Sequence, residues 1–117
     1  MDLGLAIQKH AEWKYKFRAA MTSDEPMDVA TISRDDYCEI GKWLHGEAQA
    51  KHSKLSSYAK CLSAHAAFHA EAGKIAALIN AKKKDQAEKM LAPGSPYAEI
   101  SKSVGLAIIE LKRDIEG

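Results

Sequence analysis

The feature that most constrains this chain is a run of side chains spaced three and four residues apart between Leu55 and Ile79. An α-helix turns once in roughly 3.6 residues, so this spacing keeps all of these side chains on one helical face. A stripe sustained over this length is typical of a helix packed along its whole length in a bundle. Its members are Leu55, Tyr58, Leu62, His65, His69, Ala72, Ala76 and Ile79.

Two further segments carry the same spacing and predict two more long helices. The first covers residues 3–20 and ends before a polar break that contains Pro26, which lacks an amide donor. The second begins at Ser95 and Pro96, a capping residue followed by the one helical position where proline is favoured. Their stripes are Leu3, Ala6, His10, Trp13, Phe17 and Ala20, and then Tyr97, Ile100, Val104, Ile108, Leu111 and Ile115.

The remaining segments predict only short helices. Ser33 is a candidate cap for a helix over residues 34–44, with Gly46 as its stop, and residues 86–91 form one further turn. No stretch alternates apolar and polar residues as a strand does. We therefore predict an all-α fold, a four-helix bundle with three long helices and one short helix that carries Cys38.

Composition limits the protein to few classes. A chain of 117 residues fits one domain, residues 1–117, and its net charge of +1 favours neither nucleic acid nor a membrane surface as a partner. Two cysteines are too few for a disulfide-built secreted scaffold. The N-terminus lacks the basic segment of a signal peptide, and no apolar run reaches membrane-spanning length. We expect a cytoplasmic protein with reduced cysteines.

Histidine is the residue type that stands out. Three of the five histidines, His10, His65 and His69, fall on core-facing stripes, whereas His45 and His52 are expected to face solvent. His65 and His69 are four residues apart, so their rings can share one ion from the same helical face. A single inward histidine is more often a hydrogen-bonded core residue than a ligand. Three together favour a metal site.

Cys38 is the candidate fourth ligand, although a small buried hydrophobe would also explain it. Three neutral imidazoles and one thiolate suit Zn²⁺ better than Mg²⁺ or Ca²⁺. Gly41 is costly inside a helix and predicts a close backbone approach there, and Trp43 is expected at the rim of the site. Cys61, one turn before His65, is either a packed thiol, a spare ligand, or a partner for oxidised Cys38.

These residues occur in three blocks that resemble the chemoreceptor zinc-binding (CZB) domain of bacterial chemoreceptors and some diguanylate cyclases. In that pattern, a His precedes an aromatic residue or Leu by three positions, then Cys-x-aliphatic-Gly-x-aromatic follows, and His-x-x-x-His comes last. The chain supplies His10-Ala11-Glu12-Trp13, then Cys38-Glu39-Ile40-Gly41-Lys42-Trp43, then His65-Ala66-Ala67-Phe68-His69.

The resemblance implies one Zn²⁺ held by His10, Cys38, His65 and His69 in a four-helix fold that commonly forms homodimers. It also implies a sensor of zinc or of oxidants such as hypochlorous acid, acting in chemotaxis or cyclic-di-GMP signalling. We expect a stand-alone module without an effector domain, and therefore a separate signalling protein as its partner. Candidate side chains for a dimer surface, lying off the main stripes, are Leu5, Ile7, Ala107 and Ile109.

A sensing mechanism follows from how the ligands are divided among helices. Two ligands lie on a long helix, whereas Cys38 lies on a short helix that is marginal alone, so we expect the Cys38–zinc bond to anchor it. Oxidation or protonation can remove a thiolate more easily than an imidazole. Loss of the Cys38 ligand would then free the short helix.

Two other classes of protein remain alternatives. A hemerythrin-like di-iron bundle also uses His-x-x-x-His, but it needs carboxylate ligands, and no Glu stands three residues before a His here. A purely structural interaction bundle would use the histidines in its core, with or without stabilising zinc. An enzyme is not expected, because four protein ligands leave no open metal position and no nucleophile–base pair stands out.

Overall fold

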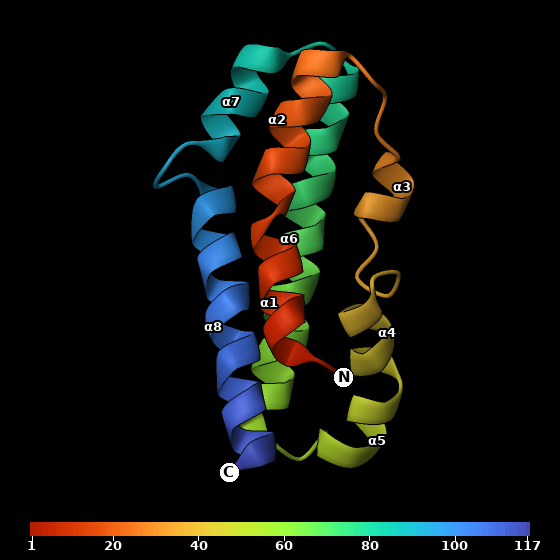
Figure 1. The fold of residues 1–117 in the computed structure, drawn as a ribbon, viewed down its shortest axis with the longest axis vertical. Coiled ribbons are helices and arrows are strands. Elements are labelled where there is room, and N and C mark those ends of the chain that lie inside the picture. Colours follow the sequence, from red (N-terminus) through yellow and green to blue (C-terminus); the bar gives the residue numbers. More distant parts are fainter.

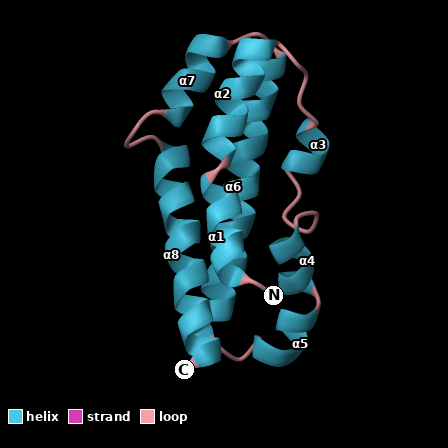
Figure 2. Cartoon of the chain, viewed as in Figure 1, coloured by secondary structure: helices cyan, strands magenta, loops and turns pink.

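The computed structural model describes residues 1–117 and contains helices and connecting loops but no strand (Figures 1 and 2). The all-α prediction is therefore confirmed. No helix combines the length and the apolar character that crossing a membrane requires. The helices run up and down the long axis of the molecule as a bundle, and one side of that bundle is built from short helices.

The N-terminal stripe forms two helices in line, α1 (Leu3–Ala11) and α2 (Trp13–Ser23), which together make one rod (Figure 1). Asp2 caps the rod, since its carboxylate accepts a hydrogen bond from the amide of Leu5 at 2.9 Å. The rod ends at Asp24, which has the left-handed φ of 57°. The predicted helix over residues 3–20 is thus present, with a local irregularity at Glu12.

The prediction of one short helix over residues 34–44 is wrong. The chain forms α3 (Val29–Ile32), α4 (Glu39–His45) and α5 (Glu47–His52) instead. Asp28 begins α3, because its carboxylate accepts hydrogen bonds from the backbone amide and the hydroxyl of Thr31 at 3.2 and 2.7 Å. Ser33 therefore ends a helix and does not begin one.

The segment between α3 and α4 is non-helical and ends at Cys38. Cys38 has the extended backbone of an N-cap, with φ of −72° and ψ of 164°, so it precedes α4 and is not part of it. Within this segment the guanidinium of Arg34 pairs with Asp36 at 2.9 Å. Gly46, the predicted stop, separates α4 from α5.

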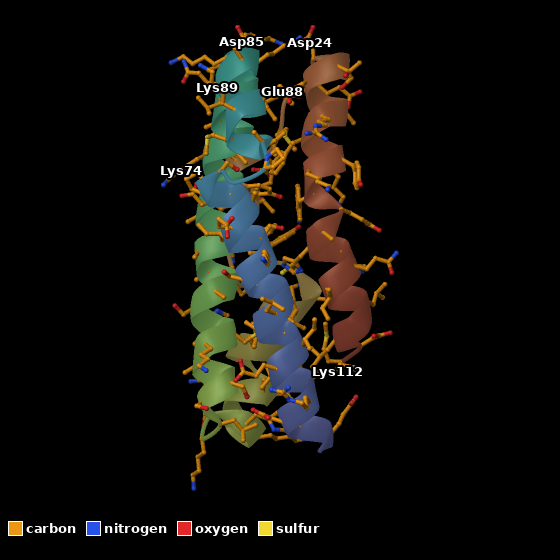
Figure 3. The ribbon with its side chains drawn as sticks, turned by 90° about the vertical axis from the view of Figure 1, so that its left-hand side faces the viewer. Asp24, Lys74, Asp85, Glu88, Lys89 and Lys112 are labelled. Atoms are coloured by element: carbon orange, nitrogen blue, oxygen red, sulfur yellow. The ribbon has the colours of Figure 1, made fainter.

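The second half of the chain follows the sequence prediction closely. It forms α6 (Ser56–Asn80), α7 (Lys84–Leu91) and α8 (Pro96–Glu116). The hydroxyl of Ser95 accepts a hydrogen bond from the amide of Ala98 at 3.1 Å, and Pro96 occupies the first helical position, as expected. At the far end of the bundle, where Figure 3 labels Asp24, the carboxylate of this residue pairs with Lys82 and Lys84 at 3.3 and 3.1 Å.

Helix α6 lies at the centre and contacts α2, α3, α5, α7 and α8. Its inward face carries the predicted stripe, and α8 packs alongside it with Val104, Ile108 and Leu111 fully buried. Ala107, expected on a dimer surface, is instead buried in the core, whereas Leu5 and Ile109 are exposed. Burial of these apolar faces stabilises the bundle and fixes α6 as the rigid support for its side chains.

A buried hydrogen bond joins α4 to α6. The hydroxyl of Tyr58 donates it to the carbonyl oxygen of Leu44 at 2.7 Å. Replacing Tyr58 by Phe removes the donor, and we expect the free energy of unfolding to fall by about 1–2 kcal/mol. Tyr15→Phe is the control, because Tyr15 is 62% exposed. Urea unfolding of both variants checks this, and equal stabilities would contradict it.

Candidate metal centre

Four side chains from three separate parts of the fold converge in the middle of the bundle. They are His10 from α1, Cys38 from the start of α4, and His65 and His69 from α6. One possible ligand atom from each lies within 4.8 Å of the others. The structure therefore brings together all four residues that the sequence selected. His45 is exposed and His52 is half-buried, and neither belongs to this group.

The spacing of three of these atoms matches a zinc coordination sphere. The Nε2 atoms of His65 and His69 are 3.2 Å apart, and Cys38 Sγ lies 3.2 and 3.5 Å from them. In a tetrahedron with Zn–N of about 2.0–2.1 Å and Zn–S of about 2.3 Å, ligand atoms are separated by about 3.3–3.6 Å. These three donors thus fit a tetrahedral zinc ion, and a ligand atom of His10 lies within 4.8 Å of each of them.

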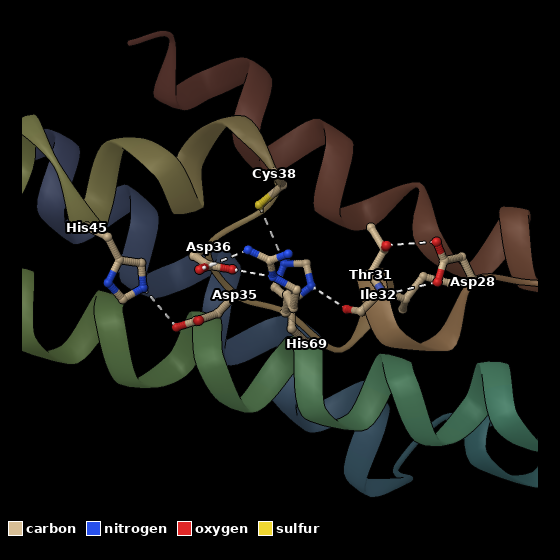
Figure 4. A network of polar contacts seen from close by, with 9 residues as sticks. Asp28, Thr31, Ile32, Asp35, Asp36, Cys38, His45 and His69 are labelled. Atoms are coloured by element: carbon tan, nitrogen blue, oxygen red, sulfur yellow. Dashed lines mark hydrogen bonds and ion pairs between the residues drawn. The ribbon is translucent and has the colours of Figure 1, made fainter.

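Hydrogen bonds to backbone carbonyls orient two of the rings. Nδ1 of His10 donates to the carbonyl oxygen of Ala6, and Nδ1 of His69 donates to that of Ile32, both at 2.8 Å (Figure 4 for His69). A carbonyl oxygen can only accept, so in each neutral ring the proton is on Nδ1 and the lone pair is on Nε2. Nε2 of His10 has no hydrogen-bond partner, as expected for a metal ligand.

Burial keeps these rings neutral. His65 is fully buried, and burial together with the neighbouring His69 and His10 lowers its pKa to about 3. Burial also lowers the pKa of His10 and of His69. Because neutral imidazole is the form that binds a metal, the surroundings hold all three rings ready for coordination near neutral pH.

The thiol of Cys38 is the most accessible member of the group. Its side chain is half-buried, and burial raises its pKa, while the backbone amides of Gly41 and Ile40 at the start of α4 partly oppose that rise. Without a cation this thiol would therefore stay protonated at neutral pH. A bound metal ion would supply the charge that stabilises the thiolate.

Cys61 does not join the cluster. It is fully buried, and burial raises the pKa of its thiol to about 11. Of the three interpretations that its sequence position allowed, these surroundings favour the packed core thiol.

Aromatic side chains enclose the group on one side and a cavity opens on the other. The ring of Phe68 packs edge-on against His10 and His69, with centroids 5.0 and 5.4 Å apart. A cavity of about 330 Å³ borders His10 and Cys38 and is walled by Leu5, Trp13, Tyr37 and Ile40, among others. The site is thus dry around α6 and reachable from the side of Cys38. Trp43, expected at the rim, does not line this cavity and lies beside His52 instead.

The close backbone approach predicted at Gly41 is confirmed. A Cβ atom at this position would overlap the carbonyl oxygen of Asp35 and lie 2.9 Å from its carbonyl carbon. Gly41 therefore lets the segment before Cys38 fold tightly against α4. Asp35 is also held by His45, whose Nε2 lies 3.0 Å from its carboxylate. Sequence reasoning assigned no role at the site to Asp35, Ala6 or Ile32, all three of which contribute backbone carbonyl oxygens here.

The pKa of the buried histidines makes the metal-free protein sensitive to acid. The folded state keeps His65 neutral down to about pH 3, whereas the unfolded chain protonates this ring below about pH 6.5. Falling pH therefore favours the unfolded state, by up to about 1.4 kcal/mol per pH unit for each such histidine. We expect urea unfolding of chelator-treated protein to show this loss of stability between about pH 6.5 and pH 4.

His65→Gln provides the comparison for that experiment. The free energy of unfolding of this variant should change less steeply with pH, because one buried titrating ring is gone. The difference in slope should correspond to close to one proton bound on unfolding. Identical pH dependence in the variant and in the original chain would contradict the assignment.

The geometry agrees with a comparison to known families. The family described as the chemoreceptor zinc-binding domain matches residues 10–76, more than half of the chain and all four converging residues. No curated protein and no solved structure gives a significant match. The chain belongs to the chemoreceptor zinc-binding domain family.

Proposed function

We propose that residues 1–117 act as one zinc-binding regulatory module in which His10, Cys38, His65 and His69 hold a single Zn²⁺. The observation that carries the proposal is the convergence of three buried imidazoles and one thiol, three of whose donor atoms lie at tetrahedral spacing, in a member of a zinc-binding family. Bound zinc would supply the positive charge that this buried donor set lacks. The ligand cluster contains no carboxylate, which argues against a di-iron site of the hemerythrin type.

We further propose that the zinc is regulatory and not catalytic. Four protein ligands complete a tetrahedral sphere and leave no position for an activated water. His65 and His69 are supported by the most deeply packed helix, so they would hold the ion in place. Cys38 borders the cavity together with His10, and its thiolate is the ligand that an oxidant most readily converts to a non-ligand.

Loss of the Cys38 ligand would release a shorter segment than the sequence alone suggests. Helix α4 has anchors of its own, because Ile40 and Leu44 are buried in the core and Tyr58 bonds the carbonyl of Leu44. Residues 33–38, between α3 and α4, lack such apolar anchors, and none of them is fully buried. We therefore place the conformational response in this segment.

The output of the module would then be a change of surface at this segment. Such a change would alter binding to a signalling protein in chemotaxis or cyclic-di-GMP signalling, or to a second copy of the chain. Exposed Leu106 and Ile109 on α8 offer apolar surface for a homodimer. A cytoplasmic location, where thiols stay reduced, suits a redox-sensitive ligand.

Metal analysis tests the zinc assignment. We expect one zinc per chain. Cys38→Ala should weaken zinc binding by 10-fold or more, because changing even a residue that only supports a metal ligand costs about 10-fold to 100-fold in affinity. Competition with a chromogenic chelator measures the zinc affinity. Cys61→Ala is the matched control and should bind zinc like the original chain. Equal losses in the two variants, or two irons per chain, would show that the assignment is wrong.

Hydrogen exchange tests the regulatory role. Hypochlorous acid oxidises a thiolate to a sulfenic acid and leaves chloride, which removes the sulfur ligand. We expect amides of residues 33–38 to lose protection after this treatment while the His65–His69 turn of α6 keeps most of its own. The Cys61→Ala protein should respond in the same way. Unchanged protection at residues 33–38 would rule out this response.

A further inference from the structure

Gly73 lies on the inward face of α6, one turn beyond His69, where the end of α3 crosses the helix. A Cβ atom at Gly73 would overlap the hydroxyl of Ser33 and lie 3.0 Å from Ser33 Cβ and 3.3 Å from Ser33 Cα. Glycine is among the poorest helix formers, and this one stands in the interior of the longest helix. Its lack of a side chain allows the backbone at Ser33 to approach α6.

The contact between Gly73 and Ser33 lies close in the chain to two parts of the metal centre, the carbonyl that orients His69 and the segment that carries Cys38. Ser33 follows Ile32, whose carbonyl oxygen accepts the hydrogen bond from Nδ1 of His69 at 2.8 Å. Ser33 also begins the segment that ends at Cys38. The distance between Ser33 and α6 therefore affects both the orientation of the His69 ring and the position of the sulfur ligand.

Glycine contacts hold this segment near both of its ends. Ser33, the first residue of the segment, packs against Gly73, and the carbonyl of Asp35 packs against Gly41 shortly before Cys38. No apolar side chain of residues 33–38 is fully buried, so close backbone approach and the contact of His45 with Asp35 position the segment. Close approach without a side chain at Gly73 does this at the α6 end.

We propose that Gly73 is a positioning residue of the metal centre: its missing side chain sets the approach of the α3 end to α6 and so aligns the Ile32 carbonyl with His69 and Cys38 with the two α6 histidines. The proposal rests on the proposed zinc function. It assigns to the site a residue that binds no metal and that sequence reasoning did not select. Metal ligation requires placement within about 0.5 Å. A Cβ at Gly73 would force the Ser33 hydroxyl to move away, and the contacts to Ser33 Cβ and Cα at 3.0 and 3.3 Å would still require a shift of the chain there.

The chain provides a matched control in Gly105, which lies in the interior of α8. A Cβ atom there meets no heavy atom within 4 Å. Gly105→Ala therefore makes the same chemical change in a long helix without steric conflict, and it should stabilise the helix slightly. Any effect of Gly73→Ala beyond this control comes from the surroundings of Gly73.

The test measures zinc affinity of the full chain by competition with a chromogenic chelator. We expect Gly73→Ala to bind zinc about 10-fold or more weakly, as for other changes around metal ligands, and Gly105→Ala to match the original chain. Ser33→Gly combined with Gly73→Ala removes both Ser33 side-chain atoms that meet the new Cβ, so it should restore most of the affinity. Ser33→Gly alone should stay near the original value.

Cobalt(II) provides a readout that a general loss of stability would not change in the same way. Substitution by Co²⁺ produces an absorption band from the thiolate–metal bond and separate bands from the tetrahedral ligand field. We expect Gly73→Ala to reduce the thiolate band of the cobalt-loaded protein more than the ligand-field bands, because displacement of Cys38 removes the sulfur donor, whereas a reoriented His69 still offers a nitrogen ligand from α6. Both bands should return in the double variant.

The outcomes separate this proposal from the zinc assignment on which it rests. If the original chain binds no zinc, the proposed function fails, whatever the variants do. If it binds zinc and Gly73→Ala binds equally well, or if Ser33→Gly does not restore the loss, the positioning role of Gly73 is wrong. Should Gly73→Ala fail to fold, Ser33→Val enlarges the other side of the contact without altering α6; it should also weaken zinc binding, and unchanged affinity would refute the proposal.

Discussion

Burial of three neutral imidazoles around one point is the constraint on which the rest of this structure depends. Such an arrangement is unfavourable without a cation, because the lone pair on Nε2 of His10 is buried without a hydrogen-bond partner. The carbonyl oxygens of Ala6 and Ile32 reinforce it by holding the ring protons on the outer nitrogens. When a metal ion is bound, the same buried donors coordinate it, and their burial then stabilises the folded protein.

The four ligands come from parts of the fold that differ in rigidity. His65 and His69 project from α6, whose inward face is packed by α8 and by Phe68, and His10 comes from the capped rod of α1 and α2. Cys38 comes from a non-helical segment held by backbone contacts at Gly73 and Gly41. The imidazole side is therefore rigid and the sulfur side adjustable. In the proposed function, oxidation of the Cys38 ligand on the adjustable side would be coupled to a change of shape.

Where periodicity governs, most of the fold and the three inward histidines of the candidate site could be predicted from the sequence. The stripes on α6 and α8 located those helices and turned His65 and His69 inward, and Ser95 with Pro96 marked the start of α8. The region between Asp28 and His52 could not be predicted in this way. There the helix boundaries depend on local side-chain caps, such as Asp28 for α3, and on glycine contacts with distant backbone. Gly41 signalled a close approach, but its partner, Asp35, is visible only in three dimensions. The backbone carbonyls that orient the rings could not be predicted either, because every residue has a carbonyl whatever its side chain.

The central claim is that one sulfur and three imidazole nitrogens hold a single zinc ion. X-ray absorption at the zinc edge of the loaded protein measures this first coordination sphere directly. The account predicts three nitrogen ligands at about 2.0–2.1 Å and one sulfur at about 2.3 Å, with the sulfur lost in Cys38→Ala. A sphere with no sulfur, with two sulfurs, or with a water or carboxylate oxygen in place of an imidazole would contradict it.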